Sequence, residues 1–131
     1  MKSLTIILIA FALGIGVPIG VPAKAQAPLV TFDQMQIQMA LQSPKLYAKK
    51  QLSAFGFAKT EFKCLTQLWT KESHWNYKAD NPKSTAFGIA QMLNETAKLP
   101  HIQINKGIRY IIKRYDTPCN AWKFWRQHNY Y

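Results

Sequence analysis

The sequence predicts an all-α fold, or an α+β fold with no more than a minimal β hairpin. Apolar residues recur at helical spacing in several short segments, and no segment alternates apolar and polar residues over the length of a strand. A small β turn or hairpin is expected at most, near residues 77–90. At 131 residues the chain has room for one domain, which follows an N-terminal stretch of different composition.

Residues 1–25 have the pattern of a secretory signal peptide. Lys2 precedes the apolar run 4–17, and two prolines and the small-residue sequence 23–27 follow it. The run is too short, and too often interrupted by Gly and Pro, for a membrane-spanning helix. We expect cleavage after Ala25 and therefore a periplasmic or secreted, cell-wall-associated protein. An uncleaved N-terminal anchor is the alternative.

Residues 26–44 are expected to form an N-terminal extension that holds one short helix. Thr31 has the position of an N-cap, with Gln34 three residues later, and the helix is expected to end at Gln42. We expect this helix to pack on the main domain. A linker, or a partner-binding site on its Met-rich face, is the alternative.

The main domain is expected to begin with two helices. Ser43 and Pro44 start the first as N-cap and first helical residue, and Gly56 ends it. Its expected apolar face consists of Leu46, Tyr47, Leu52 and Phe55. The second helix opens at residues 60–61 and leads to Glu72.

Three further helices are expected after residue 91. Asn94–Leu99 is predicted as a short helix that Pro100 ends, and 121–127 as the last helix. Between them, residues 102–115 have apolar and basic residues on opposite faces. The apolar face is Ile104, Ile108, Ile111 and Ile112, and the basic face is Lys106, Arg109 and Lys113.

Glu72 is the candidate for chemistry because it continues an apolar helix face. Phe62, Leu65, Trp69 and Glu72 follow one another at spacings of three or four residues, so they share one side of a helix. A carboxylate on such a face loses solvation, which favours the protonated form that a general acid needs near neutral pH. The alternative is that Glu72 reaches water from the last helical turn.

The residues after Glu72 have the composition of a polar cleft wall. Ser73 and an aromatic-polar run are followed by the turn signal Asn81-Pro82, and then by small residues, Gly88 and Gln91. Small residues let a backbone approach a ligand closely. A glutamine can both donate to and accept from a sugar amide or hydroxyl.

The run CLxxLWxKESxWNYxAxNPxSxAFGIxQ at residues 64–91 resembles the lytic transglycosylase-like domains of the lysozyme-like superfamily. The nearest branch lies at the C-terminus of aggregation-promoting factors. The similarity covers about residues 45–131, so it implies a small lysozyme-like helical domain there. Thr85, Ala90 and Asn129 depart from the family pattern.

The resemblance implies that Glu72 is a single catalytic acid and base. It would protonate the glycosidic oxygen between N-acetylmuramic acid and N-acetylglucosamine, and then deprotonate the muramoyl 6-hydroxyl, which closes a 1,6-anhydro ring. Ser73 and Gln91 match family residues that orient the glutamate and hold sugar amides, and Tyr110 matches a tyrosine of the later helix. No other acidic residue has the position of a second catalytic carboxyl: Asp33, Glu61, Asp80, Glu95 and Asp116.

Aromatic residues near polar ones are candidates for stacking on sugar rings, with packing as the alternative for each: Trp75, Tyr77, Trp122, Trp125 and Tyr131. Of these we expect Trp122 and Tyr131 to bind substrate. His74, His101 and His128 share no metal-ligand spacing and are interpreted as surface residues. We therefore expect neither a metal nor a cofactor.

Cys64 and Cys119 are the only two cysteines, and an even pair is a candidate disulfide in an exported protein. The family has cysteines at both corresponding positions, which implies that the two are joined.

The chain carries a net charge of +11, and residues 1–25 contribute two of its 17 basic and none of its 6 acidic residues, which leaves +9 without them. Peptidoglycan strands and the anionic cell wall are the expected partners, with an envelope machine as a further possibility. We expect a monomer and no nucleic-acid partner, since the basic residues are scattered. A muramidase that uses water and a non-catalytic basic wall- or nucleic-acid-binding module are the alternatives.

Overall fold

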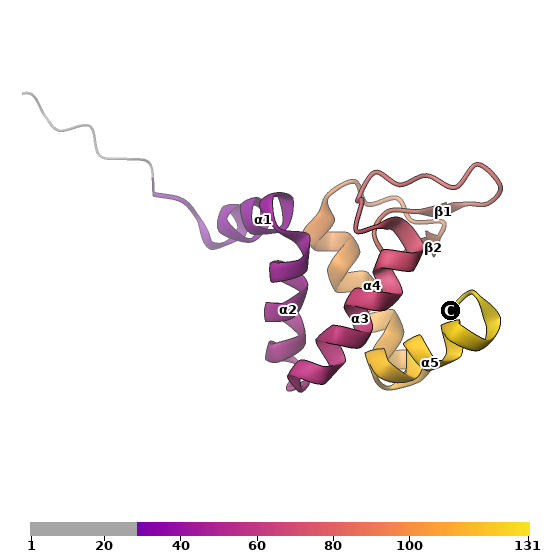
Figure 1. Cartoon of the computed structure of the whole chain (residues 1–131). Coiled ribbons are helices and arrows are strands. Elements are labelled where there is room, and N and C mark those ends of the chain that lie inside the picture. The colour runs from indigo at the N-terminus through magenta and orange to yellow at the C-terminus, as the bar shows by residue number, and fades with distance from the viewer. Residues whose placement is uncertain (1–28) are drawn as a thin grey trace, which may run out of the picture.

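The computed structural model describes residues 29–131, so the interpretation of residues 1–25 as a signal peptide lies outside the described residues. The described part is mostly helical and contains one small antiparallel hairpin, as the sequence predicts (Figure 1). In chain order the elements are α1 (Phe32–Gln42), α2 (Pro44–Ala54), α3 (Lys59–Ser73), β1 (Ala86–Phe87), β2 (Met92–Leu93), α4 (Pro100–Tyr115) and α5 (Pro118–His128).

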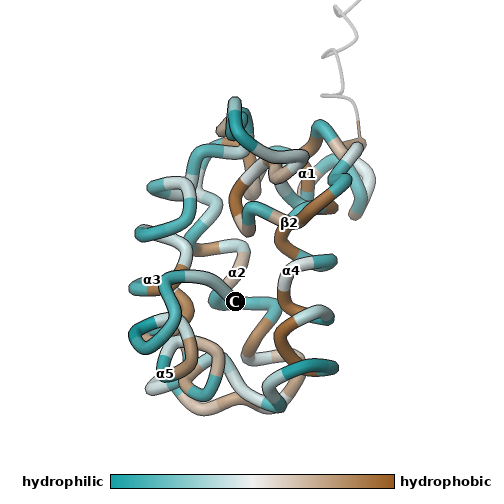
Figure 2. The backbone as a smooth tube through the Cα atoms, turned by 90° about the vertical axis from the view of Figure 1, so that its right-hand side faces the viewer, coloured by the Kyte–Doolittle hydropathy of each residue, from teal (hydrophilic) through white to brown (hydrophobic). Residues whose placement is uncertain are grey.

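The helices pack around one apolar core. α3 has its most extensive contact with α5, α2 packs on both α3 and α4, and α1 lies at the margin against α2 and α4 (Figure 1). The core contains the predicted stripe of α3 and three isoleucines of α4, all at most 1% exposed: Leu65, Leu68, Trp69, Ile104, Ile108 and Ile111. Apolar and polar residues alternate in bands along α4, because only one face of this helix is buried (Figure 2).

Gly107 explains how α4 can lie so close to Trp69. A Cβ atom at this position would lie 2.7 Å from Cζ2 of Trp69 and 2.8 Å from Cβ of Ala90. Any side chain here would therefore push α4 away from the helix that carries Glu72. The glycine thus allows the close approach of α4 to α3, the helix that carries Glu72.

The helix starts follow local sequence chemistry. Thr31 forms the predicted capping box with Gln34, in which each side chain bonds the other residue's backbone N–H. α2, α4 and α5 each begin with a proline, which has no N–H to leave unpaired at this position. None of the helices within residues 29–131 has the length and apolar character needed to cross a membrane.

Glu61 and the disulfide tie α3 to the start of α5. The Glu61 carboxylate accepts a hydrogen bond of 2.7 Å from the backbone N–H of Cys119, where the positive end of the helix dipole favours an anion. Cys64, about one turn after Glu61, forms a disulfide with the same Cys119, and the Cα atoms of the two cysteines are 4.9 Å apart. This confirms the pairing that the resemblance implied.

The predicted helix over residues 94–99 is wrong, and its backbone is irregular. Side chains take the backbone bonds that a helix would use: Glu95 accepts from the N–H of Ala97, and Gln103 donates to the carbonyl of Ala97. Pro100 therefore begins α4 and does not end an earlier helix.

Smaller corrections concern element ends and exposure. α5 begins at Pro118, three residues before the prediction, because Thr117 caps it. The hairpin extends past residue 90, since β1 pairs with β2 in the register Ala86–Leu93. Leu46 and Phe55 are about half exposed, at 46% and 49%, so they lie outside the buried face of α2.

Candidate active site

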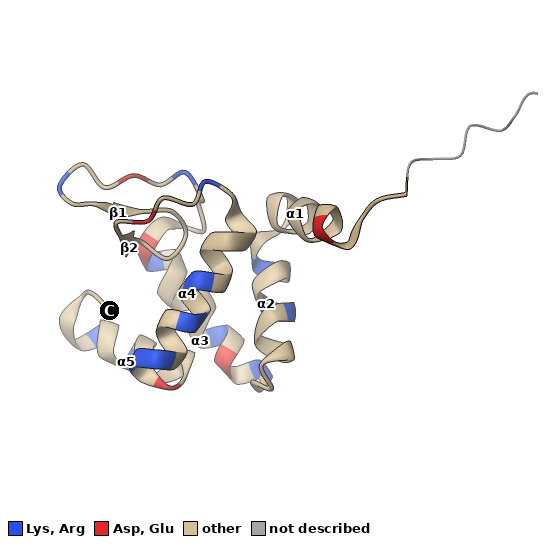
Figure 3. Ribbon diagram, turned by 180° about the vertical axis from the view of Figure 1, so that it is seen from behind, with Lys and Arg blue, Asp and Glu red and all other residues tan. Residues whose placement is uncertain are grey.

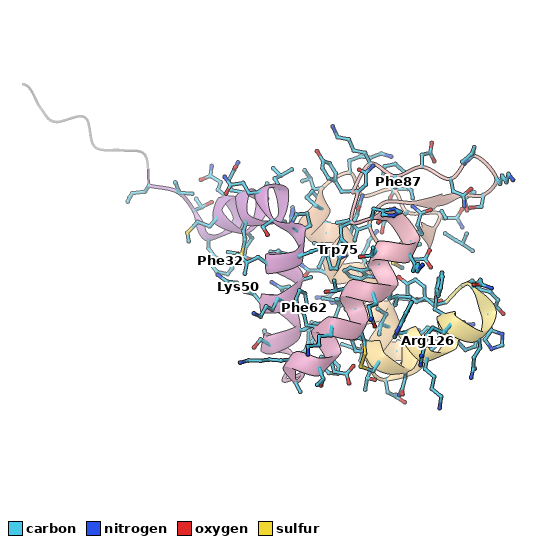
Figure 4. All side chains as sticks on the ribbon, in the orientation of Figure 1. Phe32, Lys50, Phe62, Trp75, Phe87 and Arg126 are labelled. Atoms are coloured by element: carbon cyan, nitrogen blue, oxygen red, sulfur yellow. A yellow bond between two sulfur atoms is a disulfide. The ribbon has the colours of Figure 1, made fainter. Side chains whose placement is uncertain are left out.

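Glu72 lies in the last turn of α3, and the two residues that follow this helix, His74 and Trp75, have a fixed conformation. His74 and Trp75 both have left-handed backbone conformations, with φ of 53° and 66°, which stops the helix. The Trp75 ring packs edge-on against the Trp69 ring, with the ring centroids 5.1 Å apart. The Trp75 indole N–H donates a hydrogen bond to the Thr66 carbonyl (Figure 4). Trp75 is 6% exposed, so its role is packing that fixes the end of α3.

Trp125 of α5 holds the Glu72 carboxyl. Its indole N–H donates a hydrogen bond to Oε1 of Glu72, with the nitrogen and oxygen 2.5 Å apart. Its ring stacks on that of Trp122, with the ring centroids 5.3 Å apart. Partial burial raises the pKa of Glu72 above its ordinary value, and the Trp125 hydrogen bond opposes that effect in part. The result is a carboxyl held in one orientation and biased towards its protonated form.

The Glu72 carboxyl opens into a cleft of about 300 Å³. The residues that line it come from the end of α3, the hairpin region and the C-terminal segment: Glu72, Asn81, Ala86, Gln91, Leu93, Asn129, Tyr130 and Tyr131. Glu72 is the only acidic side chain among them. Amide, aromatic and small apolar groups make up the rest, which suits an uncharged ligand that is rich in amides and hydroxyls.

Tyr131 anchors the C-terminal segment across the floor of the cleft. Its hydroxyl accepts a hydrogen bond from the Trp69 indole at 2.9 Å and donates one to the Ala90 carbonyl at 2.8 Å. Burial and the negative charge of Glu72 raise the pKa of Tyr131 well above its ordinary value, so the phenol stays neutral. Tyr131 lines the cleft, and its hydroxyl joins α3, the hairpin region and the chain end; its predicted binding of substrate stays a prediction.

Ser73 and Gln91 both bond the wall of the cleft. The Ser73 hydroxyl donates to the Ile89 carbonyl at 2.7 Å, so it ties α3 to the wall and forms no bond with Glu72. Gln91 donates through Nε2 to the carbonyls of Gly88 and Ala79, at 2.9 and 3.3 Å. Both bonds use the nitrogen, so Oε1 of Gln91 remains an acceptor for a ligand N–H or O–H.

Gln103 of α4 is the wall residue that sequence reasoning missed. It is 1% exposed, and its side chain accepts from the N–H of Ile89 and donates to the carbonyls of Tyr77 and Ala97. These bonds join three separate parts of the loop to one helix. A polar residue on the otherwise apolar face of α4 was the signal that could have identified it.

The remaining predicted residues take different places around the cleft. Tyr110 lines a neighbouring hollow of about 180 Å³ together with Gln91 and Tyr131, and its ring lies 5.7 Å from that of Tyr131. Trp122 is not among the residues that line the Glu72 cleft; it supports Trp125 by stacking. Trp125 was only a candidate for stacking on a sugar ring; its hydrogen bond to Glu72 was not predicted, because 53 residues separate the two in sequence.

Two other carboxylates are held by structural partners. Glu61 bonds the start of α5, and Glu95 pairs with Lys106 at 2.8 Å. Among residues 29–131, no group of three or more His, Cys, Asp or Glu side chains is placed to hold a metal ion. His101 is partly buried, and its Nδ1 is inaccessible to solvent.

Comparison of the chain with protein-family models, with curated proteins and with solved structures found no match. The chemistry of the cleft is therefore argued from its own side chains. A carboxyl with a raised pKa can give a proton to a leaving oxygen and take one back. The amides of Asn81, Gln91 and Asn129 and the ring of Tyr130 can bind a neutral polar ligand beside it.

Proposed function

We propose that this protein is an exported peptidoglycan lytic transglycosylase, in which Glu72 is the single acid and base. The observation that supports the proposal most strongly is the Glu72 carboxyl, which has a raised pKa and no second acidic side chain in its cleft. Glycosidases that use water normally need two carboxyl groups. A reaction in which the substrate supplies its own nucleophile needs only one.

The first step uses Glu72 as a general acid. Trp125 occupies Oε1, so Oε2 is the oxygen that carries the proton. The proton passes to the glycosidic oxygen as the bond from C1 of N-acetylmuramic acid to that oxygen breaks. N-acetylglucosamine then leaves with a free 4-hydroxyl, and Glu72 becomes a carboxylate that the Trp125 N–H stabilises.

The second step uses the same carboxylate as a base. The 6-hydroxyl of the muramoyl residue attacks C1 and gives its proton to Glu72, which restores the acid. A new C1–O6 bond replaces the broken glycosidic bond, so the product is a 1,6-anhydro sugar and no water is consumed. The substrate's own N-acetyl group is expected to stabilise the cationic centre between the two steps.

The wall and the aromatic groups position the sugars in this scheme. In this scheme Oε1 of Gln91 accepts from an N-acetyl N–H, and the ring of Tyr130, which lines the same cleft and is 58% exposed, contacts a sugar. Ser73 and Gln103 keep the wall in place and do not touch the substrate themselves. We propose that the protein acts as a monomer on glycan strands in the periplasm or at the cell wall.

Mass spectrometry of fragments released from purified peptidoglycan tests the proposal. We expect residues 26–131 to release anhydromuropeptides, and Glu72→Gln, which keeps a similar shape, to release at least a thousandfold less. Asp80→Asn is the matched control, because Asp80 is exposed and lies outside the cleft, and it should retain full activity.

The other outcomes identify the alternatives. Fragments with reducing ends would mean a muramidase that uses water. No release, with wall binding retained by both the wild type and Glu72→Gln, would mean a non-catalytic wall-binding module. Activity that survives in Glu72→Gln would remove Glu72 from the mechanism.

A further inference from the structure

The cleft beside Glu72 continues along the molecule as a groove. Gln91, Leu93 and Tyr131 line both the Glu72 cleft and the neighbouring hollow of about 180 Å³. Leu93 and Tyr110 in turn line both this hollow and a third one, of about 330 Å³, against α4. The three hollows therefore form one path from the Glu72 carboxyl, past the hairpin, to the exposed face of α4.

The far end of this groove is basic, in contrast to the Glu72 end. Lys106, Arg109 and Lys113 line the third hollow and lie on one face of α4. Basic residues follow one another along this helix, as the blue segments of α4 in Figure 3 show. Leu93 is 68% exposed and forms an apolar surface between the two ends of the groove.

Two of these basic side chains have no acidic partner within residues 29–131. Lys106 pairs with Glu95 at 2.8 Å, which is the only ion pair among the residues that the structure describes. Arg109 and Lys113 are exposed and thus keep an uncompensated positive charge at the groove. The Lys106–Glu95 pair fixes the hollow without neutralising the charge of its two neighbours.

We propose that Arg109 and Lys113 bind the carboxylates of a muramoyl peptide stem while the glycan lies in the groove beside Glu72. This inference rests on the proposed function, since it names the part of the same substrate that the basic end recognises. The N-acetyl and hydroxyl groups of the glycan are neutral, and the stems that branch from it carry its carboxylates. A groove with a neutral polar end and a basic end matches this distribution of charge.

A binding measurement on the Glu72→Gln protein tests the inference without depending on turnover. The probes are a peptide-bearing muropeptide tetrasaccharide, the same compound with its carboxylates converted to methylamides, and neutral tetra-N-acetylchitotetraose. We expect the free-acid muropeptide to bind about tenfold more tightly than the methylamide form, since two exposed charges contribute modestly. The preference should shrink as salt is raised.

Variants of Arg109 and Lys113 test whether these two residues bind the carboxylates, or whether the net positive charge of the protein accounts for the preference. Arg109→Gln with Lys113→Gln should abolish the preference for the free acid, whereas Arg109→Lys with Lys113→Arg should keep most of it. Lys49→Gln with Lys50→Gln is the matched control, because it removes two exposed charges from α2, away from the groove. This control should keep the full preference, and thermal melts should show all three variants folded.

The failures are distinguishable. Equal binding of the free-acid and methylamide probes, or an equal loss of preference in the α2 control, overturns this inference and leaves the proposed function standing. Failure of all three probes to bind, together with no release of anhydromuropeptides by the wild type, overturns both.

Discussion

The helical core and the loop over residues 74–99 both contribute to the candidate site, and they are stabilised in different ways. The core consists of apolar side chains that are almost fully buried, such as Leu65, Leu68 and Ile108. The loop has only a hairpin with two strands of two residues each; Trp75, Ile89 and Ala90 anchor it in the core, and the polar side chains of Ser73 and Gln103 bond its backbone to the helices. The Glu72 carboxyl thus lies at the end of a core helix, whereas Asn81 and Gln91 of the cleft lie on a loop whose backbone depends on side-chain hydrogen bonds.

This difference separates two kinds of variant. Changes in the core should lower the stability of the whole domain. Changes in the bonds of the loop should affect the shape of the cleft as strongly as they affect global stability. The variants below are ordered from the largest expected effect to the smallest.

Replacing both cysteines with serine should have the largest effect on the core. The disulfide joins α3 to α5 and closes a loop of 55 residues, so its loss should lower the free energy of unfolding by about 4 kcal/mol. Urea denaturation with and without reductant measures this value. A reduced wild type that is as stable as the oxidised protein would contradict the role of the disulfide.

Gln103→Leu should remove the attachment of the loop to α4. The substitution leaves the N–H of Ile89 and the carbonyls of Tyr77 and Ala97 without their partners, which should cost about 3 kcal/mol. Gln67→Leu is the control, because Gln67 is exposed on α3 and its replacement should change stability little. Hydrogen exchange should show faster exchange over residues 77–97 in Gln103→Leu, and unchanged exchange there would contradict the attachment.

Gly88→Ala and Gly56→Ala form a matched pair that separates crowding from backbone strain. Both glycines have φ near +80°, so an alanine at either position should cost about 1 kcal/mol through strain alone. A Cβ at Gly88 would also clash with Oε1 of Gln103, whereas nothing lies within 4 Å of one at Gly56. We therefore expect Gly88→Ala to cost about 1–2 kcal/mol more in urea denaturation, and equal costs would contradict the close packing of the loop on Gln103.

Glu72→Gln should raise thermal stability slightly at pH 7. Because burial raises the pKa of Glu72 in the folded state, the folded protein favours the protonated form, and that stabilisation is lost as pH rises through the folded pKa. Glutamine is neutral at every pH, so the variant should melt above the wild type at pH 7, and the difference should close below the ordinary glutamate pKa of 4.5. A lower melting temperature for the variant at pH 7 would contradict a desolvated carboxylate.

Glu61→Gln provides a control of opposite sign for this effect. The Glu61 carboxylate bonds the backbone N–H of Cys119 at the start of α5, where a negative charge is stabilising. Its replacement should lower the melting temperature at pH 7. The two substitutions on the same helix should therefore shift stability in opposite directions.

The core was predictable from the sequence because local periodicity determines it. The spacing of Leu65, Trp69 and Glu72 predicted the buried face of α3, and the isoleucines of α4 did the same for the facing helix. The capping box at Thr31 is also local, since both of its partners lie within one helical turn. Glu72 was placed in the site because it continues such a face.

The loop and the partner of Glu72 were not predictable in the same way. Residues 94–99 have a sequence compatible with a helix, but the side chains of Glu95 and Gln103 bond their backbone. The contact between Trp125 and Glu72 depends on how α5 packs on α3, which no spacing within either helix encodes. Tertiary hydrogen bonds decided both features.

The most direct test of Glu72 as a desolvated acid is an NMR titration of its side-chain carboxyl carbon, in the wild type and in Trp125→Phe. We expect a midpoint above 4.5 in the wild type. We expect a still higher midpoint in Trp125→Phe, because the indole hydrogen bond lowers the pKa. A wild-type midpoint at or below 4.5, or a midpoint that falls in Trp125→Phe, would contradict the central claim that burial and Trp125 together set the acidity of Glu72.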